Sequence, residues 1–450
     1  MSRHFTESAA REKPAPGAVG APNAVHRIAT LGLAIVAAGL LSGIAGVTLT
    51  FVLRAVEHLT FGYSGGGFLT GVETAPDWRR VVGPAVGGLL SGAGWWLVRR
   101  HRHVPSLNDI VRDPAATRHL GTVVVDAFLQ VLVVGSGASI GREGAPRQTA
   151  AVLASAATQR LRLADPARQA LIAGAAGAGL SAVYNTPIAG ALFAVEVILR
   201  TRRLSAAAIS LSVSFLGTSV LWFVHGTAPT YHLPGGTTDW VPVALWSIVA
   251  IVPCLLLGRV FSRITSAAQD RHTGPTVRLV VSIGSASAIL GLIGWWAPEL
   301  FGNGKAVIDA IADGDRSLLL LVALVALKPL VTAMFLRTGA TGGLLTPSMA
   351  TGAAFGASVA VVLRHFGVPA DVPSFALVAA AGCLATTQEA PFFAVFFTWE
   401  LARPAPWELI CFLITAIGAT AIYRMRHPQD PTQRRMALGR VGRRRPTRAR

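Results

Sequence analysis

Three long stretches of this chain contain no charged side chain. Residues 28–53, 204–238 and 279–298 hold no Asp, Glu, Lys or Arg. About 20 consecutive apolar residues are enough for an α-helix to cross the hydrocarbon core of a bilayer. The stretches therefore predict an all-α polytopic membrane protein, because each of them is long enough to span.

Composition supports this class and sets it apart from soluble domains. Charged residues make up only 14% of the chain, whereas soluble domains carry about 25%. The 47 glycines suit closely packed helices and helices that break at mid-membrane. Helices are predicted at 28–56, 78–100, 121–134, 142–160, 167–183, 187–201, 204–225, 240–268, 275–297, 317–337, 347–364, 373–386, 390–402 and 406–425.

Charge distribution divides the chain into three parts. Residues 1–27 are polar and rich in Pro, Ala and Gly, which predicts a disordered N-terminal tail, and residues 28–425 form the transmembrane domain. Residues 426–450 form a basic tail, and residues 424–450 carry ten arginines against one acid, Asp430. Arginine-rich segments stay on the cytoplasmic side, so both termini are predicted to be cytoplasmic. Binding of anionic lipid by the tail is an alternative; a nucleic-acid partner is not expected.

The chain repeats itself weakly. In the first half, GREGAP at 141–146 is followed by NTPIAGALFAVE at 185–196; in the second, GGLLTP at 342–347 is followed by APFFAVFFTWE at 390–400. The earlier segments share a glycine and a proline five residues apart, and the later ones share a proline and a glutamate nine residues apart. The chain therefore divides into two halves, at about 28–225 and 240–425. Because their helices are interrupted at matching glycine and proline positions, we predict a binding site where the halves meet.

One acid lies in the glycine-rich turn GSGASIGREGAPRQ at 135–148, and it is Glu143. A carboxylate at membrane depth is costly and is by default a functional-site hypothesis. A glycine-rich break before a helix leaves free backbone N–H groups, which bind anions together with the positive end of the helix dipole. We therefore interpret Glu143 as a tethered anion that competes for such a site. The alternative is that the glycines serve helix packing only.

GSGASIGREG at 135–144, NTPIAGALFAVE at 185–196 and GLLTP at 343–347 resemble the CLC family of chloride channels and chloride/proton antiporters. The resemblance covers about residues 28–425. It implies a fold of two inverted-topology repeats with broken and tilted helices. It also implies a homodimer in a bacterial inner membrane, with chloride or other small anions and membrane lipid as partners and with one pore per subunit.

The resemblance also implies the site. Glu143 is the gating residue. The anion-binding positions, through their backbone amides, are Gly141, Arg142, Gly144, Gly343, Leu344 and Leu345. Lys328 falls where the family often has a lysine within a membrane helix, and snorkelling toward an interface is the alternative for it.

Three departures from the family pattern bear on the mechanism. Arg102 stands where an anion-contacting serine belongs; it either binds the anion or, as we favour, faces the cytoplasm. Val197 stands at the position of the internal proton-transfer acid, and the adjacent Glu196 is expected to be structural, bonded to nearby backbone or to basic groups. A tyrosine that serves the inner anion is missing, because Tyr423 comes too early and 431–433 reads PTQ.

These departures favour a passive, voltage- or pH-gated chloride channel, because valine cannot relay a proton. The alternative is a chloride/proton antiporter with a non-standard internal proton path. An intramembrane enzyme is disfavoured because no metal spacing such as H-E-x-x-H occurs. No metal or cofactor is expected. We also expect a compact form without a soluble regulatory module.

Overall fold

The computed structural model describes residues 24–161, 163–233, 239–314 and 316–426. The predicted tails at 1–27 and 426–450 fall almost entirely outside the described residues. The first half contains α1 (Ala24–Phe61), α2 (Phe68–Thr74), α3 (Asp77–His101), α4 (Leu107–Arg112), the 3-10 helix η1 (Pro114–His119), α5 (Leu120–Gly135), α6 (Gly144–Thr158), α7 (Asp165–Tyr184), α8 (Pro187–Leu192), the π-helix η2 (Phe193–Ile198) and α9 (Leu204–His225).

The second half follows the same style of long and short helices. It contains α10 (Trp240–Val249), α11 (Ile251–Asp270), α12 (Val277–Ile293), the 3-10 helix η3 (Pro298–Leu300), α13 (Lys305–Ala312), α14 (Leu318–Arg337), α15 (Leu345–His365), α16 (Val372–Gln388), α17 (Pro391–Ala402) and α18 (Glu408–Arg426). Across the described residues no β-strand forms, which confirms the all-α class. The single helix predicted at 240–268 is wrong, because the chain breaks at Ala250 between α10 and α11.

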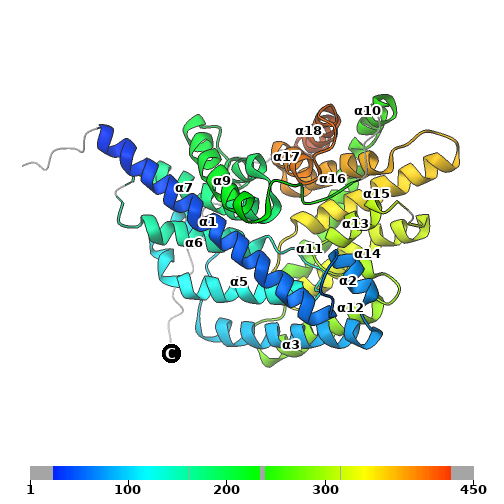
Figure 1. The fold of residues 1–450 in the computed structure, drawn as a ribbon, viewed down its shortest axis with the longest axis horizontal. Helices are drawn as coiled ribbons and strands as arrows, with labels where there is room; N and C mark the ends of the chain where they lie inside the picture. Colours follow the sequence, from blue (N-terminus) through cyan, green and yellow to red (C-terminus); the bar gives the residue numbers. More distant parts are fainter. Residues whose placement is uncertain (1–23, 162, 234–238, 315, 427–450) are drawn as a thin grey trace, which may run out of the picture.

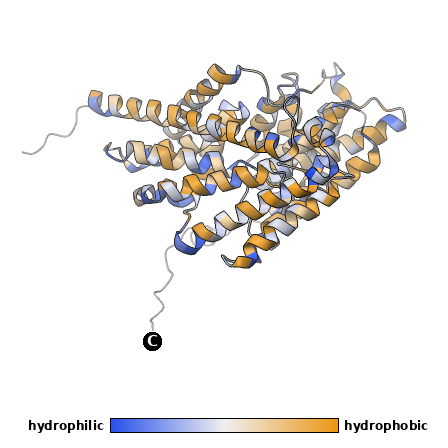
Figure 2. Ribbon diagram, turned by 60° about the horizontal axis from the view of Figure 1, so that its bottom comes forward, coloured by the Kyte–Doolittle hydropathy of each residue, from blue (hydrophilic) through white to orange (hydrophobic). Residues whose placement is uncertain are grey.

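Eight of the helices in the described part of the chain are long and apolar enough to cross a membrane, by length and composition. Shorter apolar helices, among them α12, α16 and α17, accompany them. Figure 2 shows apolar residues along the helices and hydrophilic residues gathered at their ends. The uneven lengths agree with the expectation of broken helices, because a helix of 12 residues such as α17 is too short to span on its own.

The same corner occurs once in each half. α7 ends at Asn185, whose φ is 58°, and α16 ends at Glu389, whose φ is 54°. Both are left-handed conformations, which asparagine adopts more readily than most residues. Two residues later, Pro187 and Pro391 begin α8 and α17, as suits proline at a first helical position. The repeat seen in the sequence is therefore also a repeat of backbone geometry.

The halves are joined by packing at two places far apart in the sequence. α3 packs along α12, and α8 packs against α17; Figure 1 shows α3 and α12 side by side along one edge of the molecule. Between them the turns of the two halves meet directly. Gly141 N–H donates to the Gly343 carbonyl at 2.8 Å, and Gly343 N–H donates to the Gly141 carbonyl at 2.6 Å.

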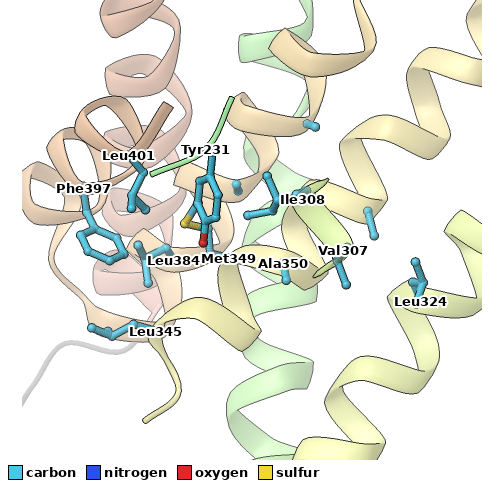
Figure 3. Packing of buried hydrophobic residues seen from close by; sticks show 14 of the residues in the cluster. Tyr231, Val307, Ile308, Leu324, Leu345, Met349, Ala350, Leu384, Phe397 and Leu401 are labelled. Carbon is cyan, nitrogen blue, oxygen red and sulfur yellow. The ribbon is translucent and has the colours of Figure 1, made fainter. Parts of the chain in front are cut away.

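A dense apolar core surrounds the second of these turns. Tyr231, in the connection after α9, lies among apolar side chains of α13, α15 and α17, including Ile308, Met349 and Leu401 (Figure 3). Its backbone N–H donates to the Leu401 carbonyl at 2.9 Å. Leu345, the first residue of α15, is part of the same cluster, so the start of α15 has little freedom to move.

Candidate functional site

Glu143 lies at the contact between the two halves. It is fully buried and directly precedes α6. Glycine is needed on both sides of its carboxylate, since a Cβ at Gly141 or at Gly343 would overlap Glu143 Oε2. The two glycine turns that the sequence predicts to share a site therefore do come together, and they enclose this carboxylate.

The two carboxylate oxygens of Glu143 have different surroundings. Oε1 accepts hydrogen bonds from the Thr346 N–H at 3.2 Å, from the Thr346 hydroxyl, and from the Tyr184 hydroxyl at 3.2 Å. Within the described residues, Oε2 is buried without a hydrogen-bond partner. Because Thr346 is the second residue of α15, the carboxylate lies at the N-terminal end of a 21-residue helix, where negative charge is favoured.

Tyr184 links Glu143 to its neighbours. Its hydroxyl accepts hydrogen bonds from Asn303 Nδ2 at 2.9 Å and from Arg142 Nε at 3.3 Å. The Arg142 guanidinium lies 4.9 Å from the centre of the Tyr184 ring. Arg147 Nε adds a hydrogen bond to the Glu143 backbone carbonyl at 2.7 Å. Together these contacts fix the carboxylate between α6, α7 and α15.

Lys328 contacts the turn at 135–141 directly and does not extend to the surface of the molecule. It is fully buried, and its ammonium donates to Ser139 Oγ at 2.9 Å, to the Gly302 carbonyl at 2.8 Å and to the Leu300 carbonyl at 3.1 Å. The snorkelling alternative for Lys328 is therefore wrong. Its place is between the turn at 135–141 and the segment before α13.

Two cavities approach Glu143 from opposite ends of α3. The Arg142 cavity, of about 570 Å³, includes Arg54, Glu57, Arg142, Asn303 and Lys305 in its lining. The Arg102 cavity, of about 550 Å³, includes Arg99, Arg102, Asp126, Gln148 and Gly342.

The position of the cavities follows from α3. The Arg142 cavity is lined by Glu57 and His58 near the end of α1. Arg79, near the start of α3, donates to the carbonyl of Thr60 in the same part of α1 at 2.9 Å, so this cavity lies toward the start of α3. Arg102 directly follows the other end of α3, and 25 helical residues span about 37 Å. Glu143 is fully buried between the two, one residue from Arg142, while Gly342 on the other side adjoins Gly343.

Two of the three departures from the family pattern concern residues that line cavities. Arg102 is exposed and also lines the Arg102 cavity, and its orientation toward the cytoplasm stays a prediction. Tyr423 borders a third cavity, of about 280 Å³, together with Leu344. The Arg259 guanidinium lies 5.5 Å from the centre of its ring. The sequence at 431–433 lies outside the described residues.

The remaining departure concerns α8 and its π-helical continuation. Val197 lies in the π-helix η2 and packs against the core. Glu196 Oε2 accepts a hydrogen bond from the Phe393 N–H at 2.8 Å. Glu196 therefore does bond to a backbone group, as expected. The donor, Phe393, lies in the second half of the molecule and is not one of the residues that adjoin Glu196 in the sequence.

Several residues around Glu143 were not found from the sequence. Thr346 stands directly after Leu345 in GLLTP, and Tyr184 directly precedes the NTP segment, so both were adjacent to predicted motifs. Asn303 carried no signal in the sequence.

Among the described residues, no group of three or more His, Cys, Asp or Glu side chains is placed to hold a metal ion.

Comparisons with known proteins agree with this architecture. Residues 87–424 match the family model described as voltage gated chloride channel. The chain is 25% identical over 411 residues to the H(+)/Cl(-) exchange transporter ClcA of Vibrio parahaemolyticus, covering 83% of this chain and 86% of the relative. It is 26% identical over 408 residues to the voltage-gated ClC-type chloride channel ClcB of Salmonella typhi, covering 86% and 95%.

A solved structure shares the fold. The crystal structure of a slow cyanobacterial Cl-/H+ antiporter superposes with a TM-score of 0.74 at 17% identity, and the match covers 92% of this chain and 99% of that one. The helical fold and the paired glycine turns define a multi-pass membrane protein of an anion-transporting class. The chain belongs to the voltage-gated chloride channel family, known as CLC, which confirms the resemblance found from its motifs.

Proposed function

We propose that this protein exchanges chloride, or a similar small anion, for protons across a bacterial inner membrane, with Glu143 as the gating residue. The observation that carries the proposal is the position of Glu143 between the two cavities. Its carboxylate occupies the start of α15, and a helix start is a site that an anion can occupy. The carboxylate and the anion therefore compete for one place.

Protonation decides the outcome of this competition. Glu143 Oε1 accepts three hydrogen bonds, and hydrogen bonds to a charged oxygen are roughly twice as strong as neutral ones. A protonated carboxyl loses part of this stabilisation and leaves, so that an anion can bind to the amides of Arg142 and Gly144 and of Leu344 and Leu345. The predicted roles of the Gly141 and Gly343 amides are corrected, because these two N–H groups donate to each other's carbonyls. Each departure of the side chain then carries one proton.

This proposal takes up the alternative of the sequence analysis in place of the passive channel. The ClcA relative is named as an exchange transporter, which supports exchange. A passive channel is the second candidate, because Val197 cannot relay a proton and the ClcB relative is named as a channel.

Neither candidate is an enzyme. We also propose a homodimer, cytoplasmic termini, and the three-part division at residues 27 and 425, since the family resemblance and the basic tail imply them.

The test uses purified protein in chloride-loaded liposomes without buffer. Chloride efflux is followed with a silver-chloride electrode while the external pH is recorded. Exchange predicts that protons enter in fixed proportion to the chloride that leaves, and that a chloride gradient drives them uphill. Efflux that needs valinomycin and leaves the pH flat contradicts exchange and supports the passive channel.

A further inference from the structure

An exchanger needs a group that carries protons between the Arg102 cavity and Glu143. Asp126 is an acid that the mechanism above does not use. It lies within α5, one of the helices apolar enough to span a membrane, and it is 1% exposed. A buried acid in such a helix is a functional-site hypothesis with a partner to be named.

Asp126 borders the cavity and is held by two neighbours. Its Oδ1 accepts a hydrogen bond from Trp95 Nε1 at 2.9 Å, and its Oδ2 accepts one from Gln130 Nε2 at 2.7 Å. Asp126 is also part of the lining of the Arg102 cavity. One side of the carboxylate is therefore within reach of water and of protons from that cavity.

The charged and titratable groups around Asp126 come from three parts of the fold. Arg99, on α3, donates to the Gly339 carbonyl at 2.7 Å and to the Thr341 hydroxyl. Arg102, His103 and His272 line the same cavity. These groups give the cavity a basic lining around Asp126.

Gln130 continues from Asp126 toward the gate. It lies one helical turn further along α5, and its Nε2 is also 3.3 Å from Gln148 Oε1 on α6. Its Oε1 is buried, and no donor reaches it from the described part of the chain. A Cβ at Gly144 would overlap this oxygen, so the free acceptor points at the residue that follows Glu143.

We propose that Asp126 loads protons from the Arg102 cavity and passes them to Glu143 along water molecules held by Gln130 and Gln148. The Asp126 carboxylate takes a proton from water in the cavity. The O–H bond on Asp126 then breaks as a proton reaches the Glu143 carboxylate through the intervening water, and Asp126 returns to its charged form. This path replaces the acid missing at Val197, and it rests on the exchange function proposed above.

The test compares Asp126→Asn with the wild type in the chloride-loaded liposomes. Asparagine retains an oxygen that can accept from Trp95 but cannot carry a proton. We expect chloride efflux to persist while coupled proton uptake falls by roughly a hundredfold, which is at the low end of what a positioned acid contributes. Asp270→Asn is the matched control, because Asp270 is an exposed acid on α11 next to the cavity residue Gln269.

The outcomes separate the two proposals. If the wild type moves chloride with a flat pH, exchange itself fails and the Asp126 path fails with it. If the wild type exchanges and Asp126→Asn keeps the same proton-to-chloride ratio, only the path is overturned. Should Asp126→Asn fail to fold, Gln130→Leu removes the acceptor that faces Gly144 and is expected to lower the ratio, whereas an unchanged ratio overturns the path.

Discussion

Glu196 and Glu400 each cap a helix in the opposite half of the molecule. Glu400 accepts hydrogen bonds from the N–H groups of Ile188 at 3.0 Å and Ala189 at 2.8 Å, at the start of α8. Glu196 accepts one from Phe393 at 2.8 Å, at the start of α17. Both glutamates lie nine residues after the proline that begins their segment. The repeat is therefore locked together by its own repeated acids.

This arrangement predicts an unequal loss of stability on mutation. Glu400→Ala leaves two N–H groups without their acceptor and is expected to cost about 2 to 4 kcal/mol, and Glu196→Ala leaves one and costs about 1 to 2 kcal/mol. Thermal unfolding in detergent measures both. Glu400→Gln keeps one acceptor oxygen and serves as the control. Equal midpoints for Glu400→Ala and Glu400→Gln would contradict the capping role.

Glu143→Gln removes the charge from the gate while keeping its size. The amide cannot take up or release a proton, so anion flux is expected to become independent of pH and proton coupling to disappear. Chloride efflux from liposomes is measured at acidic and at neutral pH for the variant and for the wild type. The wild-type flux should differ between the two pH values, by roughly tenfold for each 1.4 kcal/mol by which the charged carboxylate stabilises the closed gate. A pH dependence that survives the mutation rules out gating by Glu143.

Tyr184→Phe weakens the hold on the Glu143 carboxylate without touching the carboxylate itself. It removes a hydrogen bond to a charged group, which contributes about 1.5 to 3 kcal/mol, so chloride efflux at neutral pH is expected to rise by roughly tenfold or more. Tyr231→Phe is the matched control, because the buried Tyr231 hydroxyl meets no hydrogen-bond partner in the described structure. Equal fluxes in the two variants would show that Tyr184 does not restrain the gate.

Glu299 gives the protein a pH-dependent stability away from the gate. Burial raises the pKa of its carboxyl above the ordinary value of 4.5, and the nearby Arg316, at 3.2 Å, opposes this only in part. The folded protein therefore holds this proton more tightly than the unfolded chain does. Its contribution to stability is full below pH 4.5 and is lost as the pH rises through the folded-state pKa.

Glu299→Gln removes this titration, so the unfolding midpoint is expected to depend less on pH just above 4.5. Thermal unfolding in detergent across that range measures the slope. Glu73→Gln provides the comparison, since Glu73 pairs with the same arginine at 2.9 Å but is 35% exposed. A slope that stays at the wild-type value would assign the pH dependence to other groups.

The sequence predicts the long helices well because length and absence of charge are local properties. It misses α2, α4 and α13, which have six to eight residues each, because so short a segment holds no apolar period of useful length. It also joins α10 and α11, although Pro253, the third residue of α11, lacks an N–H and crowds the carbonyl of Val249 at the end of α10, which favours a break there.

The candidate site divides in the same way. Glu143 and the glycines beside it are predictable because the acid and the glycines are neighbours within one short segment, residues 135–148. Thr346 and Tyr184 reach Glu143 from 203 and 41 residues away, so only the fold brings them there. Asp126 did carry a signal, since it is an acid inside the apolar helix predicted at 121–134.

The two cavities also determine where an applied voltage acts. In the proposed function, water filling each cavity would carry the potential of its own side inward, and the electric field across the membrane would be concentrated on the region around Glu143. A charge moved across the full membrane potential gains about 2.3 kcal/mol per 100 mV. A carboxylate that swings only a few ångströms through this barrier therefore crosses a large share of the field, and we expect its movement to respond to voltage without any arginine-rich sensor helix.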